Sequence, residues 1–305
     1  MRKILLCLLF LTAVCRPGLA ADKIRVVATN SQFADLVNNI AGDSAEIYFV
    51  VSPKRDPHFI APTPRDVLKI KKADVLVHAG LDLELWRGPL LDAAGRGDFV
   101  RGEHAVDLSR GIELLEVPTD ISRAGGDIHV FGNPHYWLDP DNVPIMARNL
   151  ADEFSTLYPD RKDVFQANMK KFLEMWDAKS VDWKKRMAPY RGAAIVTYHN
   201  SWPYFALRYG LEVAGLLEPK PGIPPTAKHL AEIENSIREK KVPVIISETF
   251  RDDRAPKKVA SATGASAVTL VQAVGELSEV KDFAGIFEYD VSALEKAFQN
   301  KGETT

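Results

Sequence analysis

Two patterns of apolar residues alternate along the first third of the chain. Short runs of consecutive apolar residues predict buried strands, and longer stretches with an apolar residue every three or four positions predict helices with one buried face. The strands are predicted at residues 23–29, 45–51 and 74–78, and the helices at residues 32–40, 64–71 and 83–94. Because strictly alternating strands and helices are typical of a sheet covered by helices, we predict an α/β domain.

Helical periodicity then continues without a strand over residues 142–158 and again over residues 160–187. The second stretch would be about 40 Å long at 1.5 Å per residue, which is enough to reach both halves of a two-domain protein. Beyond it, strands are predicted at 193–198, 242–247 and 267–271, and helices at 202–209, 226–240 and 254–263. We therefore predict an α/β fold with mainly parallel sheets, divided into an N-terminal lobe (21–158), a linking helix (159–189) and a C-terminal lobe (190–305).

Residues 1–20 have the pattern of a secretory signal peptide. They begin with the basic residues Arg2 and Lys3, continue with an apolar run too short to span a bilayer, and end at Ala20, where we expect cleavage. Both cysteines of the chain, Cys7 and Cys15, lie in this segment. The exported chain therefore has no disulfide, thiolate metal ligand or thiol nucleophile, and we expect it in the periplasm.

Cys15 could in principle carry a lipid, because residues 11–15 loosely resemble the lipid-attachment motif of bacterial lipoproteins. Val14 is bulky for the position just before the cysteine, so we expect no lipid anchor at Cys15. No later segment is apolar for long enough to cross a membrane. We therefore expect the protein to reach the membrane only through a partner.

Composition and net charge indicate which classes of macromolecule the protein can bind. The chain has 305 residues, of which 46% are hydrophobic and 26% charged, as in globular proteins. Its 39 basic and 41 acidic side chains give a net charge of -2, so no overall positive field attracts nucleic acid. We expect no nucleic-acid partner.

Polar residues lie where the predicted strands end, and ligands of parallel sheets bind at such ends. His199, Glu248 and Gln272 follow strands of the second domain, while His58 and His135 lie in loops of the first. Three histidines in separate loops of an exported chain that lacks cysteine suggest imidazole binding of zinc, copper, nickel or iron. Each could instead be a loop histidine that hydrogen-bonds to backbone, and the prolines beside His58 and His135 also fit simple turns. Spacing alone leaves both interpretations open.

Several motifs resemble, in order, those of the metal-binding solute receptors of bacterial ABC importers. This family includes the periplasmic zinc-uptake binding proteins and the manganese-binding lipoprotein receptors. The resemblance extends from about Ile24 to about Leu294, and the residues that carry it are Asp56-Pro57-His58, Pro62-Thr63-Pro64-Arg65-Asp66, Ala73-Asp74-Val75-Leu76-Val77, Asn133-Pro134-His135-Tyr136-Trp137-Leu138-Asp139-Pro140, Thr197-Tyr198-His199 and Thr263-Gly264-Ala265.

The resemblance implies two α/β lobes joined by one long rigid helix, with a divalent metal in the cleft between them. It assigns His58 and His135 as ligands from the first lobe and His199 as the ligand from the second. Manganese-type members often have a carboxylate at the position of His199, and three imidazoles favour Zn²⁺ over Mn²⁺. The function implied is not enzymatic: a monomer captures the metal and delivers it to an ABC permease and its ATPase. Release should take loop motion or small tilts of the lobes, because a long helix is a poor hinge.

The fourth ligand departs from the family pattern. Many members have an aspartate after the last strand, where this chain has Gln272, and a neutral amide binds zinc weakly. We predict Glu248 as the fourth ligand, with Gln272 or water as alternatives. Glu248 could instead form a salt bridge with Arg251 or Arg254. Asp127 and His129, in a short loop before His135, could form a weak secondary metal site.

Two other functions are compatible with parts of the sequence. A secreted zinc hydrolase would also use three histidines and an open fourth position, with Glu248 as general base. The chain lacks the zincin and serine-nucleophile motifs that would favour it. A surface adhesin, a label that some members of the family carry, would need a repeat or an anchor that the sequence does not supply.

Overall fold

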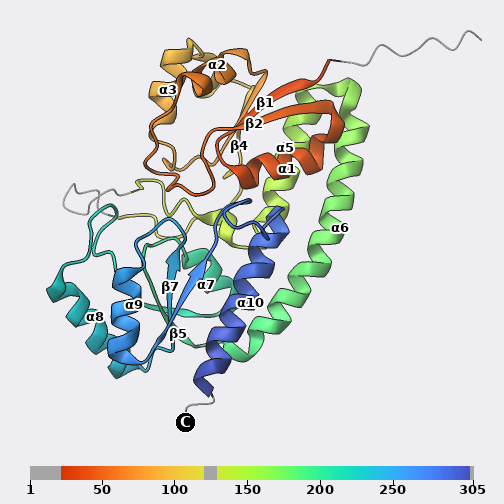
Figure 1. The fold of residues 1–305 in the computed structure, drawn as a ribbon. Coiled ribbons are helices and arrows are strands. Elements are labelled where there is room, and N and C mark those ends of the chain that lie inside the picture. Colours follow the sequence, from red (N-terminus) through yellow and green to blue (C-terminus); the bar gives the residue numbers. More distant parts are fainter. Residues whose placement is uncertain (1–21, 120–128, 303–305) are drawn as a thin grey trace, which may run out of the picture.

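The computed structural model describes residues 22–119 and 129–302 of the chain, so the predicted signal peptide, Cys15 and Asp127 lie outside the described residues. Two α/β lobes lie one above the other, and one long helix runs along the side of both (Figure 1). Within the described ranges, none of the helices combines the length and the apolar character needed to span a membrane.

The first lobe contains a parallel sheet of four strands in the order β2-β1-β3-β4. Its strands are β1 (Ile24–Ala28), β2 (Ala45–Phe49), β3 (Val75–His78) and β4 (Ala105–Asp107), and its helices are α1 (Ser31–Ala41), α2 (Pro64–Lys72), α3 (Arg87–Ala94) and α4 (Asp98–Arg101). The three predicted strands are confirmed. β4 was not predicted, because three residues are too few to show a periodicity.

The start of α2 is set by its sequence and limits the loop that carries His58. Asp66 Oδ2 accepts a hydrogen bond from the backbone N–H of Thr63 at 2.6 Å, and Thr63 Oγ1 accepts one from the backbone N–H of Asp66 at 3.4 Å. This reciprocal capping box, with Pro64 in the first turn, fixes where the helix begins. The loop after β2 is thereby held at both ends by regular structure.

After the first sheet the chain forms α5 (Val143–Leu157), a short 3₁₀ turn (Pro159–Arg161), the long helix α6 (Lys162–Met187) and a second 3₁₀ turn (Ala188–Tyr190). With 26 residues, α6 is about 39 Å long at 1.5 Å per residue. It packs on α1 and α5 in the first lobe and on α10 in the second, as Figure 1 shows. The prediction of one long helix between two lobes is confirmed, while the domain limits at residues 158 and 190 stay a prediction.

Two tryptophans fix α6 to the rest of the molecule. The Trp176 indole donates a hydrogen bond to the carbonyl oxygen of Pro140 at 2.7 Å, and its ring lies 5.6 Å from that of Phe283 in α10. The Trp183 ring stacks on Phe287 of α10 at 5.2 Å. Both indoles are fully buried, so bending the helix would expose large apolar surfaces.

The second lobe repeats the arrangement of the first, with a parallel sheet in the order β6-β5-β7-β8. Its strands are β5 (Ala194–Thr197), β6 (Glu212–Leu216), β7 (Val244–Glu248) and β8 (Ser266–Leu270), and its helices are α7 (Pro203–Tyr209), α8 (Ala227–Lys240), α9 (Arg254–Thr263) and α10 (Phe283–Gly302). Sequence reasoning missed β6 and α10. β6 is partly exposed and contains a glycine, and α10 carries Gly285 in its first turn, which weakens the usual signals.

Candidate metal centre

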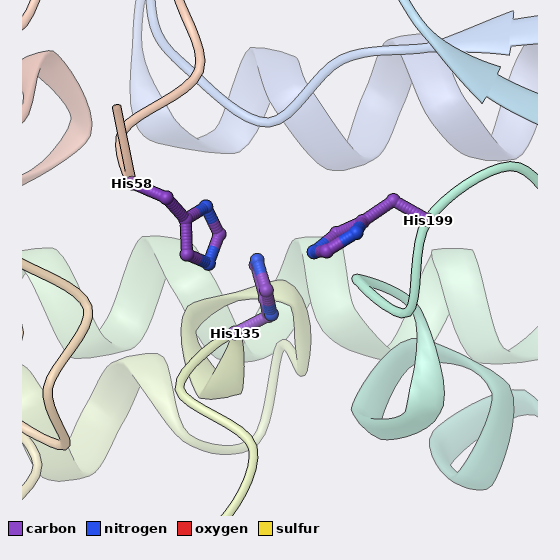
Figure 2. Close-up of side chains that lie close together, drawn as sticks. All are labelled: His58, His135 and His199. Atoms are coloured by element: carbon purple, nitrogen blue, oxygen red, sulfur yellow. The ribbon is translucent and has the colours of Figure 1, made fainter. Parts of the chain in front are cut away.

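Three histidines from distant segments meet between the two lobes (Figure 2). His58 lies in the loop after β2, His135 directly precedes the 3₁₀ turn Tyr136–Leu138, and His199 follows β5. One ligand atom of each ring lies within 4.8 Å of the other two. The ring centroid of His58 is 5.0 Å from that of His135 and 5.4 Å from that of His199. The centroids of His135 and His199 are 5.4 Å apart. The structure thus brings together the three histidines that the sequence singled out.

The Nδ1 atom of each ring donates a hydrogen bond to an oxygen. His58 donates to Asp56 Oδ1 at 2.7 Å, and His199 donates to a carboxylate oxygen of Glu218. His135 donates to Asn133 Oδ1 at 2.9 Å. The proton of each neutral ring therefore lies on Nδ1, so Nε2 is the atom of each ring that can bind a metal, although His58 Nε2 also lies 3.2 Å from His129 Nε2.

The amide of Asn133 is oriented by its own donors. Its Nδ2 donates to Glu116 Oε2 at 2.9 Å and to the carbonyl oxygen of Asn200 at 2.8 Å, so Oδ1 must face His135. Oδ1 also accepts the backbone N–H of His135 at 3.0 Å. Asp56 Oδ1 accepts the backbone N–H of His58 at the same distance. In both segments, an acceptor two residues before the histidine fixes backbone and ring together.

Burial keeps the rings of His135 and His199 neutral, which is the form of imidazole that binds metal. His135 is 1% exposed and His199 is 5% exposed. Burial lowers the pKa of His199, and burial together with the charges of His58 and His199 lowers the pKa of His135 well below 6.5. In the described part of the chain, His135 Nε2 is buried without a hydrogen-bond partner. An unpartnered buried nitrogen costs about 1–3 kcal/mol, so a packed loop histidine explains this ring poorly and a ligand explains it well.

Asp56, which bonds to His58, and Glu248, at the end of β7, have pKa values shifted in opposite directions. Burial acts to raise the pKa of Asp56, but its hydrogen bonds to His58 and the charges of His58 and Arg251 outweigh burial and lower the pKa to about 2. Asp56 therefore remains a strong acceptor for His58 at neutral pH. In Glu248, burial prevails and raises the pKa to about 7.

Glu248 ends β7 and is 2% exposed. Its Oε1 accepts the indole N–H of Trp202 at 2.9 Å, and its Oε2 has no hydrogen-bond partner among the described residues. The group of ligand atoms within 4.8 Å of one another comprises the three histidines without Glu248. Among the described residues Glu248 forms no ion pair with either arginine: Arg251 pairs with Asp56 and Glu218, and Arg254 pairs with Asp252.

Gln272 also lies buried, at 3% exposure, after β8. Neither atom of its side-chain amide has a hydrogen-bond partner within residues 22–119 and 129–302. Its backbone carbonyl accepts the indole N–H of Trp137. Both polar atoms of this buried amide are therefore available to a ligand or a water molecule.

His129 lies against the cluster rather than in a separate loop. Its Nε2 is 3.2 Å from the Nε2 of His58, and its ring centroid is 6.5 Å from that of His135. Burial, followed by the charges of His58 and His199, lowers its pKa to about 3. From the sequence, His129 could form a weak secondary site with Asp127; because Asp127 lies outside the described residues, that alternative stays open. The only signal for this position in the sequence was its closeness along the chain to His135.

Sequence reasoning assigned no role to the acceptors Asp56, Asn133 and Glu218. The repeated pattern of acceptor, proline and histidine at 56–58 and 133–135 could have indicated the first two. Glu218 follows His199 by 19 residues and carries no local signal.

Two parallel-sheet lobes, one rigid connecting helix and three convergent imidazoles define a metal-binding solute receptor. The family model described as "Zinc-uptake complex component A periplasmic" matches residues 26–297. The chain belongs to this family, which confirms the resemblance drawn from its motifs, and it is a metal-binding component of an ABC transporter.

Relatives are named for two different metals. The chain is 30% identical over 272 residues to the manganese ABC transporter substrate-binding lipoprotein PsaA of Streptococcus pneumoniae, covering 85% of each chain. It is 27% identical over 302 residues to the zinc-binding lipoprotein AdcA of the same species, covering 98% of this chain and 59% of that one. A crystal structure of ZnuA superposes with a TM-score of 0.76 at 22% identity and covers 90% of this chain and 99% of that one, which shows the shared fold.

These names correct one expectation. Both relatives are called lipoproteins, which contradicts our expectation that Cys15 carries no lipid anchor. That expectation rested on the bulk of Val14 alone, and the size of one neighbouring side chain is a weak criterion for a lipid-attachment site. We therefore withdraw it.

Proposed function

We propose that this protein captures Zn²⁺ in the periplasm and delivers it to a membrane permease driven by an ATPase. The observation that carries the proposal is the convergence of three imidazoles whose Nδ1 protons are all engaged by oxygen acceptors. Each ring then offers Nε2 to the same ion, and no proton has to leave a neutral ring on binding.

The choice of zinc over manganese follows from the donor atoms. Zinc is well served by imidazole nitrogen in a tetrahedral site, whereas Mn²⁺ prefers oxygen ligands. The two carboxylates nearest the cluster, Asp56 and Glu218, are occupied by hydrogen bonds from His58 and His199. These carboxylates orient the histidine ligands and do not themselves serve as oxygen ligands of the ion.

Glu248 is our proposed fourth ligand. Its Oε2 is buried without a partner, and its raised pKa means that it often carries a proton at neutral pH when no metal is present. A dication would displace that proton and recover the cost of a buried carboxylate. His129, Gln272 and water are the other candidates, and E248Q separates Glu248 from them.

Metal analysis of the protein purified without added metal tests the proposal. We expect one zinc per chain and a higher affinity for Zn²⁺ than for Mn²⁺ in competition with a chelator. H135Q should lose the ion, and the control H104Q should keep it, because His104 is exposed and its Nδ1 donates to the carbonyl oxygen of Asp74.

Tighter binding of Mn²⁺, or binding unaffected by H135Q, would contradict the assignment. Turnover of esters or peptides by the zinc-loaded protein above that of free zinc, lost in H135Q, would favour the zinc hydrolase instead.

A further inference from the structure

One guanidinium lies between the two carboxylates that orient His58 and His199. Arg251 Nη2 is 2.8 Å from Asp56 Oδ2, and Arg251 Nη1 is 3.7 Å from Glu218 Oε1. These contacts connect the ring of His58 to the ring of His199. The series runs through Asp56, Arg251 and Glu218. This series crosses from one lobe to the other, because Asp56 follows β2 and Arg251 follows β7.

The series is nearly closed to solvent. The side chains of Arg251 and Asp56 are each 15% exposed, and that of Glu218 is 4% exposed. Ion pairs this little exposed are screened far less than surface pairs, and removing one partner leaves a buried charge behind. Two carboxylates and one guanidinium leave one net negative charge beside the cluster, which complements a dication.

The Asp56–Arg251 contact is the one that can separate when the lobes move. Glu218 is tied to its own lobe, because its Oε1 accepts the backbone N–H of Gly222 at 2.8 Å. Arg251 lies over the rings of Tyr198 and Phe250 of the same lobe, at 5.7 and 5.5 Å. Asp56 moves with His58, whose backbone and ring both bond to it.

We propose that Arg251 is a positioning residue that latches the two lobes and couples their closure to the orientation of the metal ligands. When the lobes are together, Arg251 holds Asp56 against His58 and Glu218 against His199. When they tilt apart, the Asp56–Arg251 pair separates, His58 loses its fixed orientation, and the ion is released. The inference rests on the proposed metal-binding function and adds how release is controlled.

An arginine suits this position better than a lysine would. Its planar guanidinium places Nη2 near Asp56 and Nη1 near Glu218 at the same time, while an ammonium is a single point of charge on a flexible stem. R251K therefore keeps the charge but should not span both acceptors.

The test measures zinc dissociation into excess chelator by stopped flow for the full-length chain and its variants. We expect R251M to release zinc at least about tenfold faster than the wild type, as for other residues that support metal ligands, and R251K to recover only part of the loss. Cobalt-loaded R251M should show a changed absorption spectrum, because the ligand rings are less well fixed. R254M is the matched control, since Arg254 is exposed and, among the residues that the structure describes, forms its ion pair with Asp252 near the start of α9; it should release zinc at the wild-type rate.

A double-mutant cycle identifies the contact. D56N keeps an oxygen that can accept from His58 but removes the charge facing Arg251. If the latch is correct, D56N/R251M releases zinc hardly faster than the faster single variant. Rate increases that multiply would overturn it.

Failure of the latch and failure of the proposed function are distinguishable. Wild-type release rates in both R251M and R251K, with zinc still lost in H199Q, would overturn the latch alone. Absence of zinc binding by the wild type would overturn the proposed function. The unfolding midpoint of each variant without metal shows whether the fold is intact. A faster release caused only by a weakened fold would appear equally in R251K and would leave the cobalt spectrum unchanged, which also counts against the latch.

Discussion

The indole N–H of Trp137 donates a hydrogen bond to the backbone carbonyl oxygen of Gln272 at 3.1 Å. Trp137 lies two residues after His135, and its ring centroid is 5.3 Å from that of His135. Gln272 follows β8 in the second lobe. The segment that presents His135 is therefore tied to both lobes, and a change in their relative position acts directly on this ring.

W137F tests this link. Losing the indole N–H leaves the buried carbonyl of Gln272 without this donor, which should lower the free energy of unfolding by about 1–3 kcal/mol. It should also weaken zinc binding, because the ring next to His135 packs less firmly. W176F is the matched control: it removes a hydrogen bond from α6 to Pro140, just before α5, and should cost similar stability without changing zinc affinity. Urea unfolding and chelator competition measure the two effects, and equal zinc affinity in both variants would refute the link.

Each of the three central histidines should be indispensable. Structural zinc sites bind with about 10–16 kcal/mol shared over four ligands, so H58Q, H135Q and H199Q should each lower the binding free energy by roughly 3 kcal/mol or more. In thermal unfolding, zinc at about a thousandfold above its Kd should stabilise the wild type by about 4 kcal/mol. The three variants should show little of that stabilisation at the same zinc concentration. A variant that keeps the full stabilisation would remove its histidine from the ligand set.

Stability without metal should depend on pH through His135. Burial lowers the pKa of His135 well below 6.5, so below that pH the unfolded chain takes up a proton that the folded chain does not. The contribution of His135 to stability is therefore present above pH 6.5 and declines as the pH falls, by at most about 1.4 kcal/mol per pH unit. H135Q removes this pH-dependent contribution to stability. Its unfolding free energy should fall less steeply than that of the wild type between pH 6.5 and 5, and parallel curves would contradict the assignment.

Glu248 should change the pH dependence of stability in the opposite direction from His135. Burial raises its pKa from 4.5 to about 7, so the folded chain keeps a proton over this interval that the unfolded chain has lost. Without metal, the wild type should therefore lose stability relative to E248Q as the pH rises from 4.5 to 7, by roughly 3 kcal/mol in all. The amide oxygen that E248Q introduces can still accept the indole N–H of Trp202, so the comparison isolates the proton.

Zinc binding offers a second measurement on the same variant. If Glu248, with a pKa of about 7, is the fourth ligand, the wild type releases about half a proton at pH 7 when zinc binds, and E248Q releases less and binds more weakly. Calorimetry in buffers of different ionisation enthalpy counts these protons. Equal affinity and equal proton release would favour His129, Gln272 or water as the fourth ligand.

Much of the fold was predictable because its signals are local. The strand and helix patterns of the first lobe reproduce β1, β2, β3 and the helices between them within a few residues. The capping box that begins α2 is also a local signal, because it joins two residues that are close in the sequence, Thr63 and Asp66. β4, β6 and α10 were missed because their lengths or glycines hide the periodicity that tertiary packing nevertheless stabilises.

For the site, the sequence by itself determined which side chains bring chemistry: three imidazoles at His58, His135 and His199, two of them preceded by an acceptor and a proline. Only the tertiary structure decided that one nitrogen of each ring lies within 4.8 Å of the other two, that Glu218 fixes the third ring, that Arg251 joins Asp56 to Glu218, and that His129 reaches His58. The physical reason is range. Turns, caps and periodicities act between neighbours along the chain, whereas ion pairs and hydrogen bonds between lobes exist only after two separate sheets have been brought together on one rigid helix.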